Sequence, residues 1–178
     1  SILPALPELE FEMLQLSGPP ALSPFRIRKL LAALQAEEPS IRGVSSAYVH
    51  LVDVTRELDA GETAVLERLL QYGPRFENVP AGTTEVWVLP RFGTISPWSS
   101  KATDIAHICG LNAIRRIERG VSYCIDTAET IAPARLRDLA VFLHDRMTES
   151  VVLGAEEAGA VFNAHDPVPF ATVDILGE

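Results

Sequence analysis

The feature that most constrains the fold is a short pattern that occurs twice, 73 residues apart. Leu22-Ser23-Pro24-Phe25 and Ile95-Ser96-Pro97-Trp98 both read apolar, serine, proline, aromatic. A serine hydroxyl can cap the free N–H groups at the start of a helix. Proline fits the first helical turn, because its missing N–H would have no partner in the helix. Each copy therefore predicts a helix start, and the chain is expected to contain two related halves.

The same elements are expected in the same order around each copy of this pattern. A short apolar run precedes each helix start, a long alternating segment follows each helix, and a second helix closes each half. Asp59, with Glu62 three residues later, predicts a capping box at the second helix of the first half. The expected strands are Met13–Leu16, Val44–Val54, Val86–Leu89 and Ile117–Asp126, and the expected second helices are Glu62–Tyr72 and Pro133–Met147.

Residue spacing also predicts which side chains face the core. Tyr48 and Tyr123 are expected to occupy matching places in the two long strands. His50, in the same alternating segment as Tyr48, is expected to be a buried histidine with satisfied ring nitrogens rather than a ligand. The helix of the second Ser-Pro pattern is expected to bury the stripe Trp98, Ala102, Ile105 and Cys109.

The β-α-β-α order, found twice, predicts an α+β fold with a mostly antiparallel sheet and helices packed on it. A unit of about 60 to 75 residues shields its own sheet poorly, so two units gain by packing about a pseudo-twofold axis. We expect a mobile lead-in over residues 1–10 and a single domain over 11–178. Its expected parts are a first repeat over about 11–74, a joining loop Arg75–Thr83, a second repeat over about 84–147, and an extension over 148–178. The extension is expected to contain a strand near Val151–Leu153, a helix near Glu156–Phe162 and a strand Val168–Ile175.

Composition excludes several function classes. The net charge of -9 and the lack of a dense Lys or Arg run argue against nucleic acid or anionic lipid as a partner. No stretch approaches the roughly 18 uninterrupted apolar residues of a membrane span, so we expect a soluble, cytoplasmic protein. Cys109 and Cys124 lack a CxxC pattern or nearby histidines at metal spacing. We therefore expect two buried thiols and no metal site.

A longer segment around the second pattern points to a family. Pro90–Leu111 resembles the signature of the large, single-chain formylglycinamide ribonucleotide amidotransferases, also called phosphoribosylformylglycinamidine synthases. Phe92 and Ile108 depart from the family pattern, at positions that could tune a contact surface. Further agreement is found at Ala21–Arg26, Glu67–Pro74, Ile117–Val121 and Val173–Gly177.

The resemblance implies a PurS-like pseudodimer at the amino terminus of a ligase of de novo purine biosynthesis. That enzyme uses ATP, Mg and glutamine to convert formylglycinamide ribonucleotide to formylglycinamidine ribonucleotide. Its synthetase and glutaminase domains lie further along a longer chain, so the resemblance implies no catalytic residue, metal or bound cofactor here. The implied role is a bridge between those two domains that supports ammonia channelling. The isolated chain is expected to be inactive and could associate with itself through its exposed interfaces.

The signature segment supplies the candidate site. Gly93 and the helix start resemble an anion-binding turn, but a helix cap that supports a contact between domains explains them at least as well. Lys101, Asp104 and His107 are spaced to form a polar row on one helix face. The candidates for the interface or channel are Arg91, Gly93, Thr94, Ser96, Trp98, Ser99, Ser100, Lys101, Asp104 and His107.

Two other functions compete with the bridge. The first is an autonomous regulatory module that binds a small metabolite at the pseudo-twofold interface. The second is a hydrolase that uses Asp104 and His107 as an acid–base pair, and it ranks last because the sequence supplies no nucleophile or oxyanion site for them.

Overall fold

Two β-α-β-α units follow one another along the chain, as the sequence predicted. The computed structural model describes residues 13–74, 83–153 and 155–162. The first unit consists of β1 (Met13–Pro20), α1 (Pro24–Glu37), β2 (Ile41–Val54) and α2 (Ala60–Leu69). The second consists of β3 (Thr83–Pro90), α3 (Pro97–Ile108), β4 (Ile114–Thr127) and α4 (Pro133–Leu139). The chain continues with a short 3-10 turn η1 (Ala140–Phe142), β5 (Glu149–Val152), α5 (Ala155–Ala158) and η2 (Gly159–Phe162).

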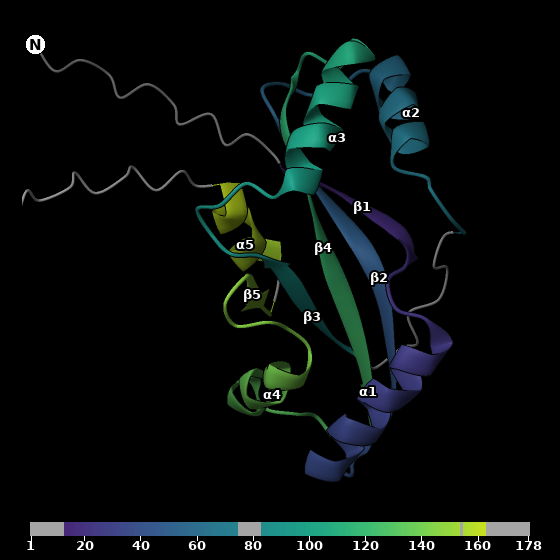
Figure 1. The fold of residues 1–178 in the computed structure, drawn as a ribbon, viewed down its shortest axis with the longest axis vertical. Helices are drawn as coiled ribbons and strands as arrows, with labels where there is room; N and C mark the ends of the chain where they lie inside the picture. The colour runs from purple at the N-terminus through teal and green to yellow at the C-terminus, as the bar shows by residue number, and fades with distance from the viewer. Residues whose placement is uncertain (1–12, 75–82, 154, 163–178) are drawn as a thin grey trace, which may run out of the picture.

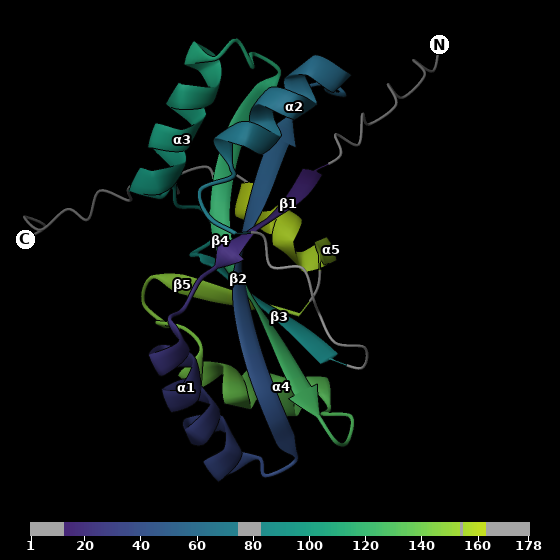
Figure 2. The ribbon, with the colours of Figure 1, turned by 90° about the vertical axis from the view of Figure 1, so that its right-hand side faces the viewer.

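One antiparallel sheet, in the order β1-β2-β4-β3-β5, joins the two units. At its centre β2 pairs with β4, and each of these strands is 14 residues long. Helices α2 and α3 lie near one end of this pair, and α1 and α4 lie near the other (Figure 1). Figure 2 shows the same grouping after a quarter turn. The expected α+β fold with helices packed on an antiparallel sheet is confirmed.

Two matching ion pairs reveal the pseudo-twofold axis. Arg42 bonds Asp126 at 2.8 Å, and Arg115 bonds Asp53 at the same distance. Arg42 and Arg115 are 73 residues apart, as are Asp53 and Asp126. A rotation that exchanges β2 and β4 therefore exchanges the two pairs.

The axis passes through the pair Tyr48 and Val121, which lie opposite each other in the register and are also 73 residues apart. The same offset makes Tyr123 the counterpart of His50. The expected match between Tyr48 and Tyr123 is therefore wrong by two residues. Alternation has a period of two, so it allows a strand to slide by two residues without changing which face is buried.

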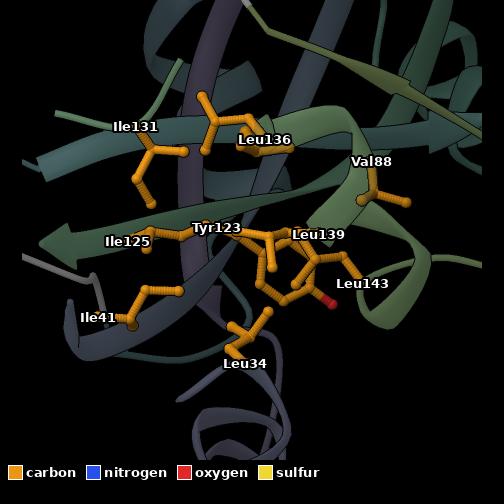
Figure 3. Close-up of a cluster of buried hydrophobic side chains, with 10 residues drawn as sticks. Leu34, Ile41, Val88, Tyr123, Ile125, Ile131, Leu136, Leu139 and Leu143 are labelled. Atoms are coloured by element: carbon orange, nitrogen blue, oxygen red, sulfur yellow. The ribbon is translucent and has the colours of Figure 1, made fainter. Parts of the chain in front are cut away.

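The two hydrophobic cores on this face of the sheet each take one helix from either unit. In the first core, α1 packs with α4 over β3 and β4, and in the second, α2 packs with α3 over β2 and β4. Figure 3 shows Leu34 of α1 and Leu139 of α4 gathered around Tyr123. The first core contains Leu34, Ile41, Val86, Val88, Tyr123, Ile125, Ile131, Leu136, Leu139 and Leu143. The second contains Val52, Val54, Leu66, Leu70, Ala106, Leu111, Ile114 and Ile117.

The opposite face of the sheet is covered in part by α5 and η2. Leu51 and Leu89 lie there against Ala158 and Val161 in a third buried cluster. These residues alternate with the core positions of their strands, so they point to the other side of the sheet. A groove of about 230 Å³ lies on this face as well, bordered by Ser45, Ala47, Trp87, Ser122 and Cys124 among others.

Several element boundaries differ from those predicted. Helix α2 ends at Leu69 rather than Tyr72. Helix α4 ends at Leu139 rather than Met147, because the chain tightens into η1 and then turns at Asp145, whose carboxylate accepts the Met147 N–H. The predicted strand near Val151 and helix before Phe162 correspond to β5 and to α5 with η2. The lead-in, the joining loop before Thr83 and the strand Val168–Ile175 lie outside the described residues.

The buried face of α3 also differs from the predicted stripe. Trp98 and Ala102 pack on the second core, but Ile105 is 41% exposed and Cys109 is exposed. The fully buried positions are Ser99 and Ala106, so α3 approaches the sheet through small side chains. No helix in the described part of the chain is long and apolar enough to cross a membrane.

We predict that Gly120→Ala lowers the free energy of unfolding by about 1–3 kcal/mol. A Cβ at this position would lie 2.7 Å from the carbonyl oxygen of Val88 and would also clash with Leu89. The backbone of a paired strand cannot easily move away. Gly43→Ala is the control, because a Cβ there meets only Asp126, at 3.9 Å. Urea unfolding measures both, and equal stability of the two variants would contradict the prediction.

Candidate functional site

A buried carboxylate organises the turn that leads into α3. Glu118 of β4 is fully buried and forms an ion pair with Arg116 at 2.7 Å. It also accepts the Ser96 hydroxyl at 2.7 Å and the Arg119 backbone N–H at 3.0 Å. Ser96 in turn accepts the Ser99 N–H at 3.0 Å as the N-cap of α3. The helix start is therefore tied directly to the centre of the sheet.

Arg116 ties the same turn to the end of the described chain. Its guanidinium donates to the carbonyl oxygens of Thr94 at 2.9 Å and Val161 at 3.1 Å, and to the Ser99 hydroxyl at 3.2 Å. It also lies over the Phe162 ring, 5.3 Å from the centroid. One arginine thus joins the signature turn, α3 and η2.

The turn itself is closed by local hydrogen bonds. Gly93 adopts a positive φ of 79°, which favours glycine. The Thr94 hydroxyl donates to the Arg91 carbonyl at 2.6 Å, and the Arg91 N–H donates to the Thr148 carbonyl at 2.9 Å. These bonds account for the small and polar residues of the signature as parts of a rigid turn beside β5.

This geometry does not fit an anion-binding turn. The Ser96 hydroxyl accepts from Ser99 and donates to Glu118, so it is committed on both sides. The Ser99 N–H donates to Ser96, and the Ser99 hydroxyl donates to the Ile117 carbonyl at 2.6 Å, so these two groups are not available to a phosphate either. A role for this turn in a contact between domains stays a prediction.

The polar row predicted on α3 divides into two parts. Lys101 and Asp104 are exposed, as is Ser100. The Nε2 atom of His107 lies 2.6 Å from the carbonyl oxygen of Ile114. Because a carbonyl only accepts, this nitrogen carries a proton and holds the end of α3 against β4. It cannot serve as the base of an acid–base pair with Asp104.

Sequence reasoning missed a second polar cluster beside the pseudo-twofold axis. The guanidinium carbon of Arg119 lies 4.3 Å from the ring centroid of Tyr48 and 4.7 Å from that of Trp98. The Trp98 ring also lies 5.8 Å from that of His50, and the Tyr72 ring lies 5.4 Å from His50. Trp98 is the only predicted site residue in this cluster of described side chains.

Hydrogen bonds fix the protonation of His50. Its Nδ1 atom lies 3.2 Å from the Leu16 carbonyl oxygen and must donate to it. The Nε2 atom is then an acceptor, and the Tyr72 hydroxyl donates to it at 2.6 Å. Burial, together with the positive charge of Arg119, lowers the pKa of His50 to about 4. The expected buried and satisfied histidine is confirmed.

The two cysteines differ in their surroundings. Cys124 is buried, and burial raises the pKa of its thiol. Cys109 is exposed at the end of α3, so the expectation of two buried thiols is wrong for this residue. Within the described residues, no group of three His, Cys, Asp or Glu side chains could hold a metal ion.

A comparison of the chain with models of protein families gives a match that covers the residues of this site. The model of the amino-terminal domain of formylglycinamide ribonucleotide amidotransferase matches residues 47–162, from within β2 to the end of η2. The chain belongs to this family. It is thus a domain of a ligase-type amidotransferase of purine biosynthesis, and the matched segment contains both the Glu118 turn and Arg119.

We predict that Glu118→Ala lowers the free energy of unfolding by about 3–5 kcal/mol, because it leaves a largely buried Arg116 without its carboxylate. Asp126→Ala, which breaks an ion pair whose arginine is 62% exposed, should cost less than about 1 kcal/mol. Chemical denaturation of both variants measures the difference. Equal losses would mean that the buried pair does not anchor the turn.

We predict that His50 makes stability depend on pH between its unfolded pKa of 6.5 and its folded pKa of about 4. In this range the unfolded chain binds a proton that the folded chain does not, so stability falls as the pH falls. The resulting decrease in the free energy of unfolding reaches about 3 kcal/mol by pH 4. His50→Gln removes this dependence, and the difference between the two unfolding curves against pH isolates it. Parallel curves for the two proteins would disprove the assignment.

Proposed function

We propose that this domain is a non-catalytic bridge within a formylglycinamide ribonucleotide amidotransferase. It holds the synthetase and glutaminase domains in register, so that ammonia released from glutamine reaches the synthetase without escaping to water. The parent enzyme uses ATP to convert formylglycinamide ribonucleotide to formylglycinamidine ribonucleotide. Family membership is the observation that carries this proposal.

The distribution of exposed apolar side chains supports two separate contact surfaces. Among the described residues, the large apolar side chains that stay exposed fall into two groups, one on or next to the helices of each core. Surfaces of this kind on a soluble domain favour protein contacts. The first group contains Phe25, Val141, Phe142 and Met147, and the second contains Tyr72, Ile95, Ile105 and Ile108.

The signature residues contribute to this role in two ways. Ser96, Ser99 and Thr94 keep the turn and α3 rigid through their bonds to Glu118 and Arg116. The exposed side chains Arg91, Ser100, Lys101 and Asp104 are left to face a partner. ATP and Mg are assigned in this proposal to other domains of the parent enzyme, as the family resemblance implies.

The test is glutamine-dependent formation of formylglycinamidine ribonucleotide by three samples: this chain, the rest of the parent enzyme without it, and the two mixed. We expect turnover only in the mixture, because a bridge is needed to bring the two active domains into register. Glutamine hydrolysis is measured in parallel as a control for the integrity of the glutaminase.

Equal turnover by the rest of the enzyme alone would refute the bridge. In that case a regulatory role becomes the next candidate. It predicts that a purine-pathway nucleotide raises the melting temperature of this chain, because a ligand specific to the folded state stabilises it.

A further inference from the structure

We propose that the groove between α2 and α3 is the docking site for an apolar segment of a neighbouring domain of the parent enzyme, and that a carboxylate on this segment pairs with Arg119 and Lys101. This proposal rests on the bridging function above and specifies one of its two contacts.

The groove combines an apolar lining with positive charge. It has a volume of about 310 Å³, and its lining includes Lys101 and Arg119 but no Asp or Glu among the described residues. The positive lining contrasts with the net charge of -9 on the chain as a whole. The apolar part of the lining consists mainly of Leu69, Leu70, Tyr72, Trp98, Ala102 and Ile105. Such a lining suits an apolar segment that also carries a negative charge.

Arg119 is a half-buried cation whose charge is not balanced by a carboxylate in the described structure. The ion pairs found among the described residues do not include it, and the neighbouring Glu118 is paired with Arg116. Tyr48 and Trp98 cover the guanidinium, which also hydrogen-bonds the Tyr72 hydroxyl. These are all neutral groups, so the positive charge of Arg119 is left for a carboxylate from outside. A partly desolvated charge gains most from a partner of opposite sign that completes its burial.

The pseudo-twofold axis supplies an internal comparison, because the fold forms the same positions twice. The 73-residue counterpart of Arg119 is Ser46, which is buried and accepts the Leu22 N–H at 3.2 Å. The counterpart of His50 is Tyr123, which packs in the first core. The scaffold therefore folds around a small neutral side chain at the position of Arg119, and its charge is specific to the α2–α3 end.

The rim of the groove favours a protein segment over a small molecule. Ile105 is 41% exposed at the lining, and Ile108 on the next turn of α3 is 84% exposed. An extended segment can cover both, whereas a small molecule in the groove would leave Ile108 in water. A second copy of this chain fits less well, because two chains that each carry a charge of -9 repel one another.

The test measures binding of this chain to the rest of the parent enzyme produced without it, by isothermal titration. Arg119→Met is expected to raise the Kd at least tenfold and to reduce its salt dependence, since it removes the charge but keeps the bulk. Lys101→Met is expected to raise the Kd several-fold. The matched control is Arg28→Met, because Arg28 is the exposed 73-residue counterpart of Lys101 on α1. It should change the Kd less than twofold.

Lys101 is exposed and takes part in no hydrogen bond or ion pair among the described residues, so its variant remains informative if Arg119→Met is poorly folded. If Lys101→Met and Arg28→Met change the Kd equally, the groove is not the docking site. The proposed bridging function still holds in that case, provided that the wild-type chain binds and restores turnover. If the wild-type chain neither binds nor restores turnover, the bridge fails and this proposal fails with it. A chain shortened to residue 162 that binds more tightly would mean that residues 163–178 compete for the groove, which would overturn the assigned occupant.

Discussion

The pairing of β2 with β4 across the pseudo-twofold axis is the interaction on which the rest of the structure depends. It is the seam between the two repeats, and both cores on the helical face are built over it. Because α1 packs with α4, and α2 with α3, neither repeat encloses a core of its own. The buried Glu118 and the stacked Arg119 both project from β4 within this seam, one to each face of the sheet. The site therefore inherits its rigidity from the contact that holds the domain together.

The sequence predicted the elements whose causes are local. Ser23 and Ser96 cap their helices with proline in the first turn, and Asp59 forms the full capping box with Glu62. The fold class followed from the order of these elements. The errors arose where residue periodicity was the only basis for a prediction. One example is the predicted match of Tyr48 with Tyr123, which is off by two residues. On α3, two adjacent stripes were both compatible with a helical period, and the sheet selected the one with smaller side chains because they permit a closer approach.

The candidate site was predictable only in part. The signature segment pointed to the turn and to α3, but the groups that give the turn its chemistry lie on β4. In the sequence, Arg116 and Glu118 read as the solvent-facing positions of a half-buried strand, whereas alternation places Arg119 on its apolar face. Their partners come from the turn before α3, from β2 and from η2, and only the folded chain brings these together. A glutamate flanked by arginines in an otherwise apolar strand was the available signal, and its meaning depended on contacts distant in sequence.

The exchange of helices between the repeats also sets the order in which a growing chain can complete its interior. All buried residues of the second core have been synthesised once the chain reaches Ile117. The first core is complete only when the chain reaches Leu143. The apolar side of α1 is synthesised well before α4, so it must remain uncovered until this distant partner emerges. Such separation along the chain slows folding, because the entropy of closing a long loop is lost before the stabilising contact forms. During synthesis the second core, which is built from the middle of the domain, can therefore form first. Helix α1 is exposed to misassociation for the longest time.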